Sequence, residues 1–112
     1  MSMTTPARLT AADRREQLLQ VALTVFAQRG YHTTSMNDIA DAAGVTKPVL
    51  YQHFDSKRAL YIAVLDAVGK NMIHAITAAT KSVPTGKAQT AAGMVAYFEW
   101  LSSDPNAFSL LF

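Results

Sequence analysis

The chain contains no cysteine, which excludes disulfide scaffolds, thiolate nucleophiles and zinc sites made of cysteine. Its N-terminal stretch "MSMTTPARLT" has no apolar segment of the kind that a secretory signal carries. The longest apolar runs, such as "VALTVFA", are too short to cross a bilayer. We therefore expect a soluble, cytoplasmic protein that does not associate with membranes.

Patterns typical of enzymes and metal sites are missing as well. The sequence has no G-x-S-x-G elbow, no H-E-x-x-H motif and no P-loop. His32, His53 and His74 are evenly spaced, but this interval places them on no common helix face, so it does not indicate a zinc site. We expect no enzymatic activity, no metal and no cofactor.

Hydrophobic residues make up 50% of the 112 residues, which is enough for a modest core. They recur at helical spacing without strand-like alternation, so the predicted fold class is all-α. All but one of the apolar stretches follow a residue that can cap a helix. The predicted helices span about 11–28, 36–43, 47–54, 57–80 and 87–101, with a sixth from 105. Gly30 and Gly44 are expected to end the first two, and Gly69 allows a bend or an early end in the fourth.

The small excess of basic residues lies in the first half of the chain. The formal net charge is +2; residues 1–60 carry seven basic and five acidic side chains, whereas residues 61–112 carry three of each. Such an excess suits a polyanionic partner, because neutralised phosphates supply most non-specific DNA affinity. Arg8, Arg14 and Arg15 either form an arm that reaches DNA or only solvate the N-terminus, and their charge leaves both open.

The predicted helix from Lys47 to Phe54 has little to bury. At about 100° per residue, Leu50 and Phe54 fall on one side and define the core direction. Gln52 lies opposite that direction, at the centre of the outward face. The remaining outward and border positions are held by Lys47, Pro48, Val49, Tyr51 and His53. A helix that enters the DNA major groove needs this arrangement, with central side chains at base edges and border groups at phosphates.

The turn before this helix fits the same interpretation. Two short helices joined by a few residues that include glycine form a helix-turn-helix, and "AAGVTK" supplies Gly44 for the turn and Thr46 for the restart. Helix pairs of this kind also occur in proteins that never bind DNA. Spacing alone therefore leaves open a helical protein-interaction module without DNA binding.

The segment "TTSMNDIADAAGVTKPVLYQHFDSKRALY" resembles the DNA-binding segment of the TetR family of transcriptional repressors, with its pattern IA-x-x-AGV-(S/T)-x-x-x-LY-x-HF-x-SK-x-x-L. The preceding "QLLQVALTVFAQRGYHTTS" is similar to the first helix of that family. The resemblance covers about residues 12–65 and rests on many positions.

The resemblance implies roles for individual residues. Phosphate contacts would be made by Tyr51, His53, Lys57 and the region of Thr34 and Ser35. Base edges would be reached from Asn37, Lys47, Pro48, Val49 and Gln52. Thr46, which opens the third helix, belongs to the same candidate set.

The resemblance also implies a domain organisation. We expect a flexible arm over residues 1–10, a helix-turn-helix DNA-binding domain over 11–56, and a long fourth helix with the truncated start of a ligand-binding and dimerisation domain over 57–112. The implied function is that of a ligand-responsive repressor. Its full-length form would bind a pseudo-palindromic operator in double-stranded DNA as a homodimer, and release it when an unknown small-molecule effector binds.

Two features depart from the family pattern. Arg58 and Ala59 stand where many members place an acidic residue, which weakens the expected cap of the fourth helix. Family chains are also considerably longer, so we interpret this sequence as a fragment. The aromatic residues of the last third form either ordinary core or part of a ligand pocket, and they are Tyr97, Phe98, Trp100, Phe108 and Phe112.

Overall fold

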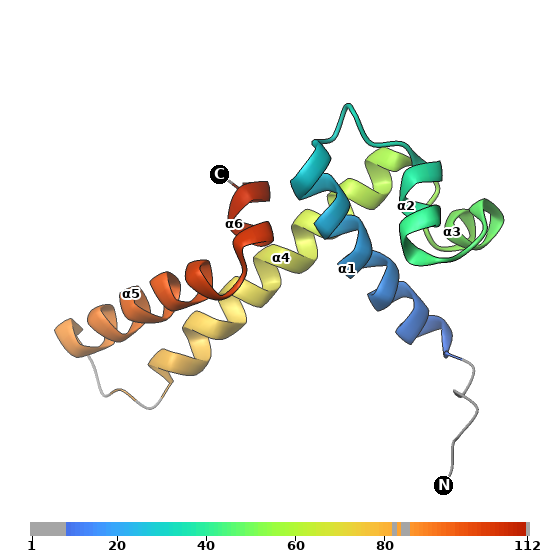
Figure 1. The fold of residues 1–112 in the computed structure, drawn as a ribbon. Helices are drawn as coiled ribbons and strands as arrows, with labels where there is room; N and C mark the ends of the chain where they lie inside the picture. The colour runs from blue at the N-terminus through green and yellow to red at the C-terminus, as the bar shows by residue number, and fades with distance from the viewer. Residues whose placement is uncertain (1–8, 82, 84–85, 112) are drawn as a thin grey trace, which may run out of the picture.

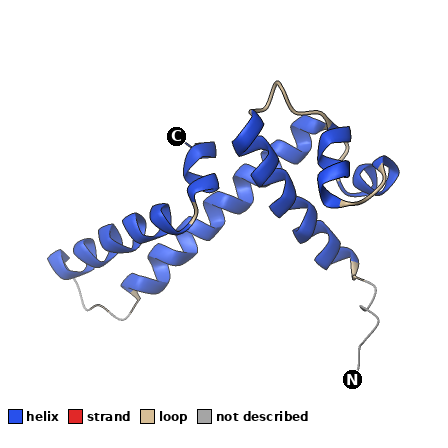
Figure 2. Ribbon diagram, in the orientation of Figure 1, coloured by secondary structure: helices blue, strands red, loops and turns tan. Residues whose placement is uncertain are grey.

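The computed structural model describes residues 9–81, 83 and 86–111. Within these ranges the chain forms six α-helices and no strand (Figure 2). The helices are α1 (Ala11–Arg29), α2 (Met36–Ala43), α3 (Lys47–His53), α4 (Lys57–Thr80), α5 (Gly86–Ser103) and α6 (Pro105–Leu111). The predicted all-α class is confirmed. The predicted helix ends agree with these bounds to within one or two residues.

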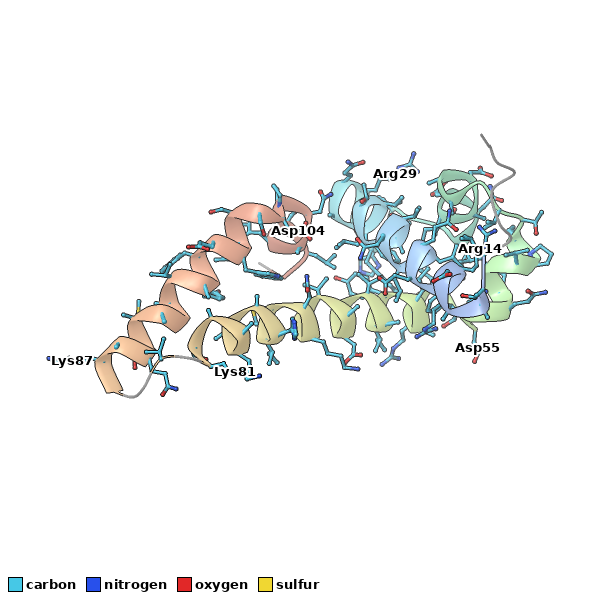
Figure 3. The ribbon with its side chains drawn as sticks, turned by 90° about the horizontal axis from the view of Figure 1, so that it is seen from below. Arg14, Arg29, Asp55, Lys81, Lys87 and Asp104 are labelled. Atoms are coloured by element: carbon cyan, nitrogen blue, oxygen red, sulfur yellow. The ribbon has the colours of Figure 1, made fainter. Side chains whose placement is uncertain are left out.

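The helices are arranged around the long α4. At one end α1 crosses α4 and packs against α2, which leads into α3 (Figure 1). Beyond the crossing, α5 runs back along the second half of α4, and α6 then returns to contact α1. Figure 3 shows Arg14 and Asp55 at one end of the molecule and Lys81 and Lys87 at the other. The radius of gyration is 17.2 Å, well above the value of about 13 Å expected for a compact domain of this size.

The helix starts follow from local capping. Thr10 Oγ1 accepts from the Asp13 N–H at 3.1 Å, and Ser56 Oγ accepts from the Ala59 N–H at 3.0 Å. Asp104 Oδ1 accepts from the Ala107 N–H at 3.1 Å, directly before Pro105. Each cap satisfies a backbone donor that has no partner within its own helix. The predicted caps are therefore confirmed.

The core lies where α1 crosses α4, and it is closed by α2 and α3. Its largest fully buried side chains are Leu18, Phe26, Ile39, Leu50, Leu60 and Val64. An aromatic cluster borders it: the Phe26 ring meets the Tyr61 ring edge-on at 5.0 Å, and the Tyr31 ring lies 4.8 Å from that of Tyr61. This cluster ties the loop after α1 to the first half of α4.

In the second half of the chain, α4 spans Lys57–Thr80 as predicted and continues through Gly69. The aromatic residues of α5 and α6 form neither one core nor one pocket, because Trp100 is buried whereas Phe98 and Phe108 are 58% and 46% exposed. Phe112 of this predicted group lies outside the described residues, as do Arg8 and most of the predicted N-terminal arm.

By its length and mean hydropathy alone, α4 is long and apolar enough to cross a membrane. This was not predicted from the sequence, because only short apolar runs were considered. Here its Leu60, Val64 and Val68 are buried against other helices of the chain. Core helices of globular proteins pass the same test, so the feature is weak evidence for a membrane.

Candidate nucleic-acid interface

The turn between α2 and α3 is built around a left-handed glycine. Gly44 has φ 69° and ψ 31°, a conformation that costs glycine little. The Val45 N–H then donates to the Ala40 carbonyl at 3.0 Å, which closes the end of α2. Thr46 Oγ1 accepts from the Val49 N–H at 3.4 Å and starts α3, with Pro48 in its first turn. The hydroxyl of Thr46 therefore caps α3.

The rotation of α3 about its own axis agrees with the sequence-based expectation. Leu50 and the capping residue Phe54 are 0% and 4% exposed, so both face the core. Val49 and His53 are half-buried at the borders. The exposed residues of this segment are Lys47, Pro48, Tyr51 and Gln52. The helix thus presents a polar, cationic face to solvent.

Six of the eleven predicted site residues border one hollow of about 470 Å³ on the surface formed by α2, α3 and the start of α4. They are Thr34, Ser35, Asn37, Lys47, Tyr51 and Lys57. Among the described residues that border this hollow, none is acidic. Hydroxyl, amide and ammonium groups are donors suited to phosphate oxygens.

Lys57 is not a free surface lysine. Its Nζ donates to the Tyr31 carbonyl at 2.9 Å and lies 4.3 Å from the centroid of the Tyr31 ring. An ammonium has three N–H donors, so this bond leaves capacity for one further acceptor or more. Lys57 therefore joins the loop after α1 to the first turn of α4. If Lys57 also contacts a phosphate, it does so while its ammonium is held at Tyr31.

Thr34 differs from the other predicted site residues because its side chain is buried. It is 2% exposed, and its Oγ1 donates to the Gly30 carbonyl at 2.7 Å. The Thr34 hydroxyl faces the protein and holds the loop that leads into α2. We therefore assign Thr34 a positioning role.

The start of α2 is held by a reciprocal capping box. Ser35 Oγ accepts from the Asp38 N–H at 3.0 Å, and Asp38 Oδ2 accepts from the Ser35 N–H at 2.9 Å. The same Oδ2 lies 3.2 Å from Arg29 Nη1. The hydrogen bond from the Ser35 N–H, aided by the Ser35 hydroxyl and the Arg29 charge, lowers the pKa of the Asp38 carboxyl. Ser35 and Asn37 both border the hollow, and Asn37 Nδ2 also donates to Asp41 Oδ2 at 3.5 Å.

Arg15, for which the sequence left open either an arm that reaches DNA or solvation of the N-terminus, instead packs behind the interface. Arg15 of α1 places its guanidinium carbon 4.6 Å from the centroid of the Phe54 ring, and its Nη1 donates to the His53 carbonyl at 3.4 Å. The neighbouring Arg14 instead donates to Gln17 of the same helix. The role of Arg15 could not be recognised from neighbouring residues, because the carbonyl that it contacts lies 38 residues later in the sequence.

Comparison with protein families agrees with this geometry. The family model described as "Bacterial regulatory proteins, tetR family" matches residues 18–64. The HTH-type transcriptional activator FasR of Mycolicibacterium smegmatis is 42% identical over 105 residues, which cover 94% of this chain and 48% of that protein. The HTH-type transcriptional repressor KstR2 of Rhodococcus jostii is 50% identical over 54 residues, 48% of this chain and 26% of that protein.

Solved structures show the same arrangement of helices. A TetR-like transcriptional regulator from Rhodococcus sp. RHA1 superposes with a TM-score of 0.86 at 30% identity, over 93% of this chain and 57% of that chain. The ketosteroid transcriptional regulator KstR2 of Mycobacterium tuberculosis gives a TM-score of 0.76 at 27% identity, over 90% and 52%. The chain thus spans about half the length of the relatives that it matches along most of its own length.

Proposed function

This chain belongs to the tetR family of bacterial regulatory proteins, and on that premise we propose that it is a sequence-specific DNA-binding transcriptional regulator. The orientation of α3 carries the proposal. Leu50 and Phe54 fasten this helix to the core, while Lys47, Pro48 and Gln52 are exposed to solvent. A helix held in this way fits the DNA major groove.

The side chains divide into two roles. Lys47, Pro48, Val49 and Gln52 of α3 read base edges, together with Asn37 of α2. Ser35, Tyr51, His53 and Lys57 contact phosphates and set the register of the helix on the duplex. The hollow between α2, α3 and α4 supports a polyanionic partner, because its described border carries two lysines and no acid.

The whole protein acts as a homodimer in this proposal. Two copies of α3 would enter successive major grooves on one side of the duplex, with half-sites about 34–36 Å apart or at a multiple of that distance. Such a protein binds a pseudo-palindromic operator in the cytoplasm. A small-molecule effector would release the operator if it binds the DNA-incompetent arrangement more tightly, since coupling between the two sites is reciprocal.

Repression is the primary proposal for the direction of regulation, since two copies bound across a promoter exclude other proteins from that DNA. KstR2, a relative at 50% identity over 54 residues, is named a repressor. Activation is the second candidate, because the relative that matches 94% of this chain is named an activator. A reporter gene whose operator lies upstream of the promoter, or overlaps it, distinguishes the two. A repressor lowers expression of the reporter when the protein is present, whereas an activator raises it.

The experiment that tests the proposal is selection of bound duplexes from a random pool, followed by fluorescence anisotropy at several salt concentrations. We expect an enriched, two-fold related sequence, and an affinity that falls as salt rises because phosphate neutralisation releases counterions. A helical protein-interaction module would show no duplex affinity even at low salt. That result would overturn the proposal.

A further inference from the structure

His32 borders the hollow between α2, α3 and α4, although its place in the sequence gave it no role in the interface. Two other residues outside the predicted set share this border, but Met36 is buried and Thr33 Oγ1 donates to the Arg29 carbonyl. His32 is exposed, and in the part of the chain that the structure describes its ring nitrogens have no hydrogen-bond partner. Its imidazole is therefore available to a molecule that enters the hollow.

The backbone on both sides of His32 is held in place. Its ring meets the Tyr31 ring edge-on, with the ring centroids 5.3 Å apart, and the Tyr31 carbonyl accepts the hydrogen bond from Lys57 Nζ. On the other side, the buried Thr34 hydroxyl donates to the Gly30 carbonyl. A side chain presented from a fixed loop loses less freedom on binding than one on a mobile segment.

The titratable groups that share the border with His32 are cationic or neutral. Lys47 and Tyr51 come from α3, and Lys57 comes from the start of α4. The two ammonium groups suit an anion, and the tyrosine hydroxyl can donate to one. The hollow therefore offers an anion donors from three segments of the chain, of which His32 supplies the one in the loop before α2.

The nearby carboxylates of α2 are engaged elsewhere. Asp38 accepts from the Ser35 N–H and pairs with Arg29 of α1 at 3.2 Å. Asp41 accepts from Asn37 Nδ2 at 3.5 Å. Neither carboxylate borders the hollow. An anionic partner for a charged imidazole at this place must therefore come from outside the chain.

Histidine differs from the lysines of the hollow because its charge changes between about pH 5 and pH 8. A phosphate beside an imidazole favours the charged form, since opposite charges attract. The charged imidazolium donates from both ring nitrogens, whereas the neutral ring donates from one. Contact with a phosphate and uptake of a proton from solvent thus support each other.

We propose that His32 is a further phosphate-contacting residue of this interface and takes up one proton from solvent when the chain binds duplex DNA. The proposal rests on the DNA-binding function proposed above. Because the proton and the duplex each favour binding of the other, affinity for DNA rises as the pH falls. At pH 6 the interface then neutralises one more phosphate than at pH 8.

The test is fluorescence anisotropy with the selected duplex, in a series of salt concentrations at pH 6 and at pH 8. For the wild type we expect an affinity about two- to fivefold higher at pH 6. We also expect a slope of log affinity against log salt that is steeper at pH 6 by about 0.9 or more. His32→Gln should reduce this difference in slope by about 0.9, because glutamine donates a hydrogen bond but takes up no proton.

Two further variants separate a charge at this position from a general effect of pH. His32→Arg carries a permanent charge, so its slope at pH 8 should already be steeper than that of the wild type by about 0.9. His74→Gln replaces an exposed histidine of α4 that does not border the hollow, and it should keep the wild-type difference. His53, which is assigned to a phosphate above, is present in every variant, so its contribution cancels in the comparison. Because His32 is exposed, both of its variants should keep the native circular dichroism spectrum.

Three results would overturn the role of His32 while leaving DNA binding in place. The first is a wild-type salt slope that is the same at both pH values. The second is a His32→Gln variant that keeps the full wild-type difference, and the third is a His74→Gln variant that loses as much of it as His32→Gln does. No affinity for any duplex at either pH would instead overturn this inference together with the proposed function.

Discussion

The Arg15 guanidinium carbon lies 4.6 Å from the centroid of the Phe54 ring, and Arg15 Nη1 donates to the carbonyl of the preceding His53. This pair joins α1 to the C-terminal end of α3. A cation near the last carbonyls of a helix is favourable, and the aromatic face adds a second attraction. Arg15 therefore supports the position of α3 from the side of α1.

Arg15→Ala should weaken DNA binding more than the loss of one positive charge explains. α3 would lose its contact with α1, so its orientation in the groove would be less well defined, while the free energy of unfolding falls by only about 0.5–1 kcal/mol. Fluorescence anisotropy against the selected duplex measures the first effect and chemical denaturation the second. Arg14→Ala is the matched control, because Arg14 is bonded within α1. Equal losses of DNA affinity in the two variants would contradict the role of Arg15.

Tyr51→Phe and Lys57→Met should weaken binding to all duplexes by similar factors. Both residues are assigned to phosphates, which carry no direct sequence information. Lys57→Met should also reduce the slope of log affinity against log salt by about 0.9. The methionine keeps an aliphatic chain against Tyr31, so the loop after α1 stays covered. A changed base preference with an unaltered salt slope would show that the phosphate assignment is wrong.

Lys47→Ala and Gln52→Ala should relax discrimination at a few base pairs, by roughly 1–3 kcal/mol each. Both side chains are exposed on α3, so the helix should remain folded. Leu50→Ala, on the opposite side of the same helix, should instead lower the free energy of unfolding by about 2–5 kcal/mol, because Leu50 is fully buried. Affinity for single-base variants of the selected duplex, paired with circular dichroism, checks both. If Gln52→Ala lost helicity, the rotation assigned to α3 would be incorrect.

Asp38→Asn should lower thermal stability at neutral pH but not at low pH. The pKa of Asp38 is lowered in the folded state, chiefly by the hydrogen bond from the Ser35 N–H, so its carboxylate stabilises the fold above the usual aspartate pKa of 3.8. That contribution is lost as the pH falls through the lower pKa of the folded state. Melting temperatures of wild type and variant, measured by circular dichroism from pH 7 downward, should therefore begin to converge below about pH 4 and meet only below the lowered pKa of the folded state. A constant difference across this range would mean that the Asp38 charge does not stabilise the capping box.

Much of the fold could be predicted because its determinants are local. Capping pairs such as Ser35 with Asp38 lie three residues apart, and the positions of Leu50 and Phe54 on one side of α3 follow from helical periodicity alone. The glycine turn at Gly44 is likewise a property of one residue and its neighbours. The helix bounds and the outward face of α3 were therefore available from the sequence.

The second half of the chain was less predictable. Periodicity places Phe98, Trp100 and Phe108 on helices, but their burial depends on which helices cross them. Trp100 is buried in the core cluster that also contains Ala107 of α6, whereas Phe98 and Phe108 are exposed. A sequence that shows only apolar spacing cannot separate these outcomes.

The sequence by itself thus determined the six helices, their caps, the rotation of α3 and the likeness to the tetR family, because each depends on residues within a few turns of one another. Only the tertiary structure decided that Arg15 reaches Phe54, that Lys57 is bonded to Tyr31, that Thr34 faces inward and that Trp100 joins the core cluster. The physical reason is that each of these contacts depends on backbone segments meeting in space. These contacts form because α1 crosses α4 and α6 returns to α1. The spacing of residues along the sequence does not reveal either arrangement.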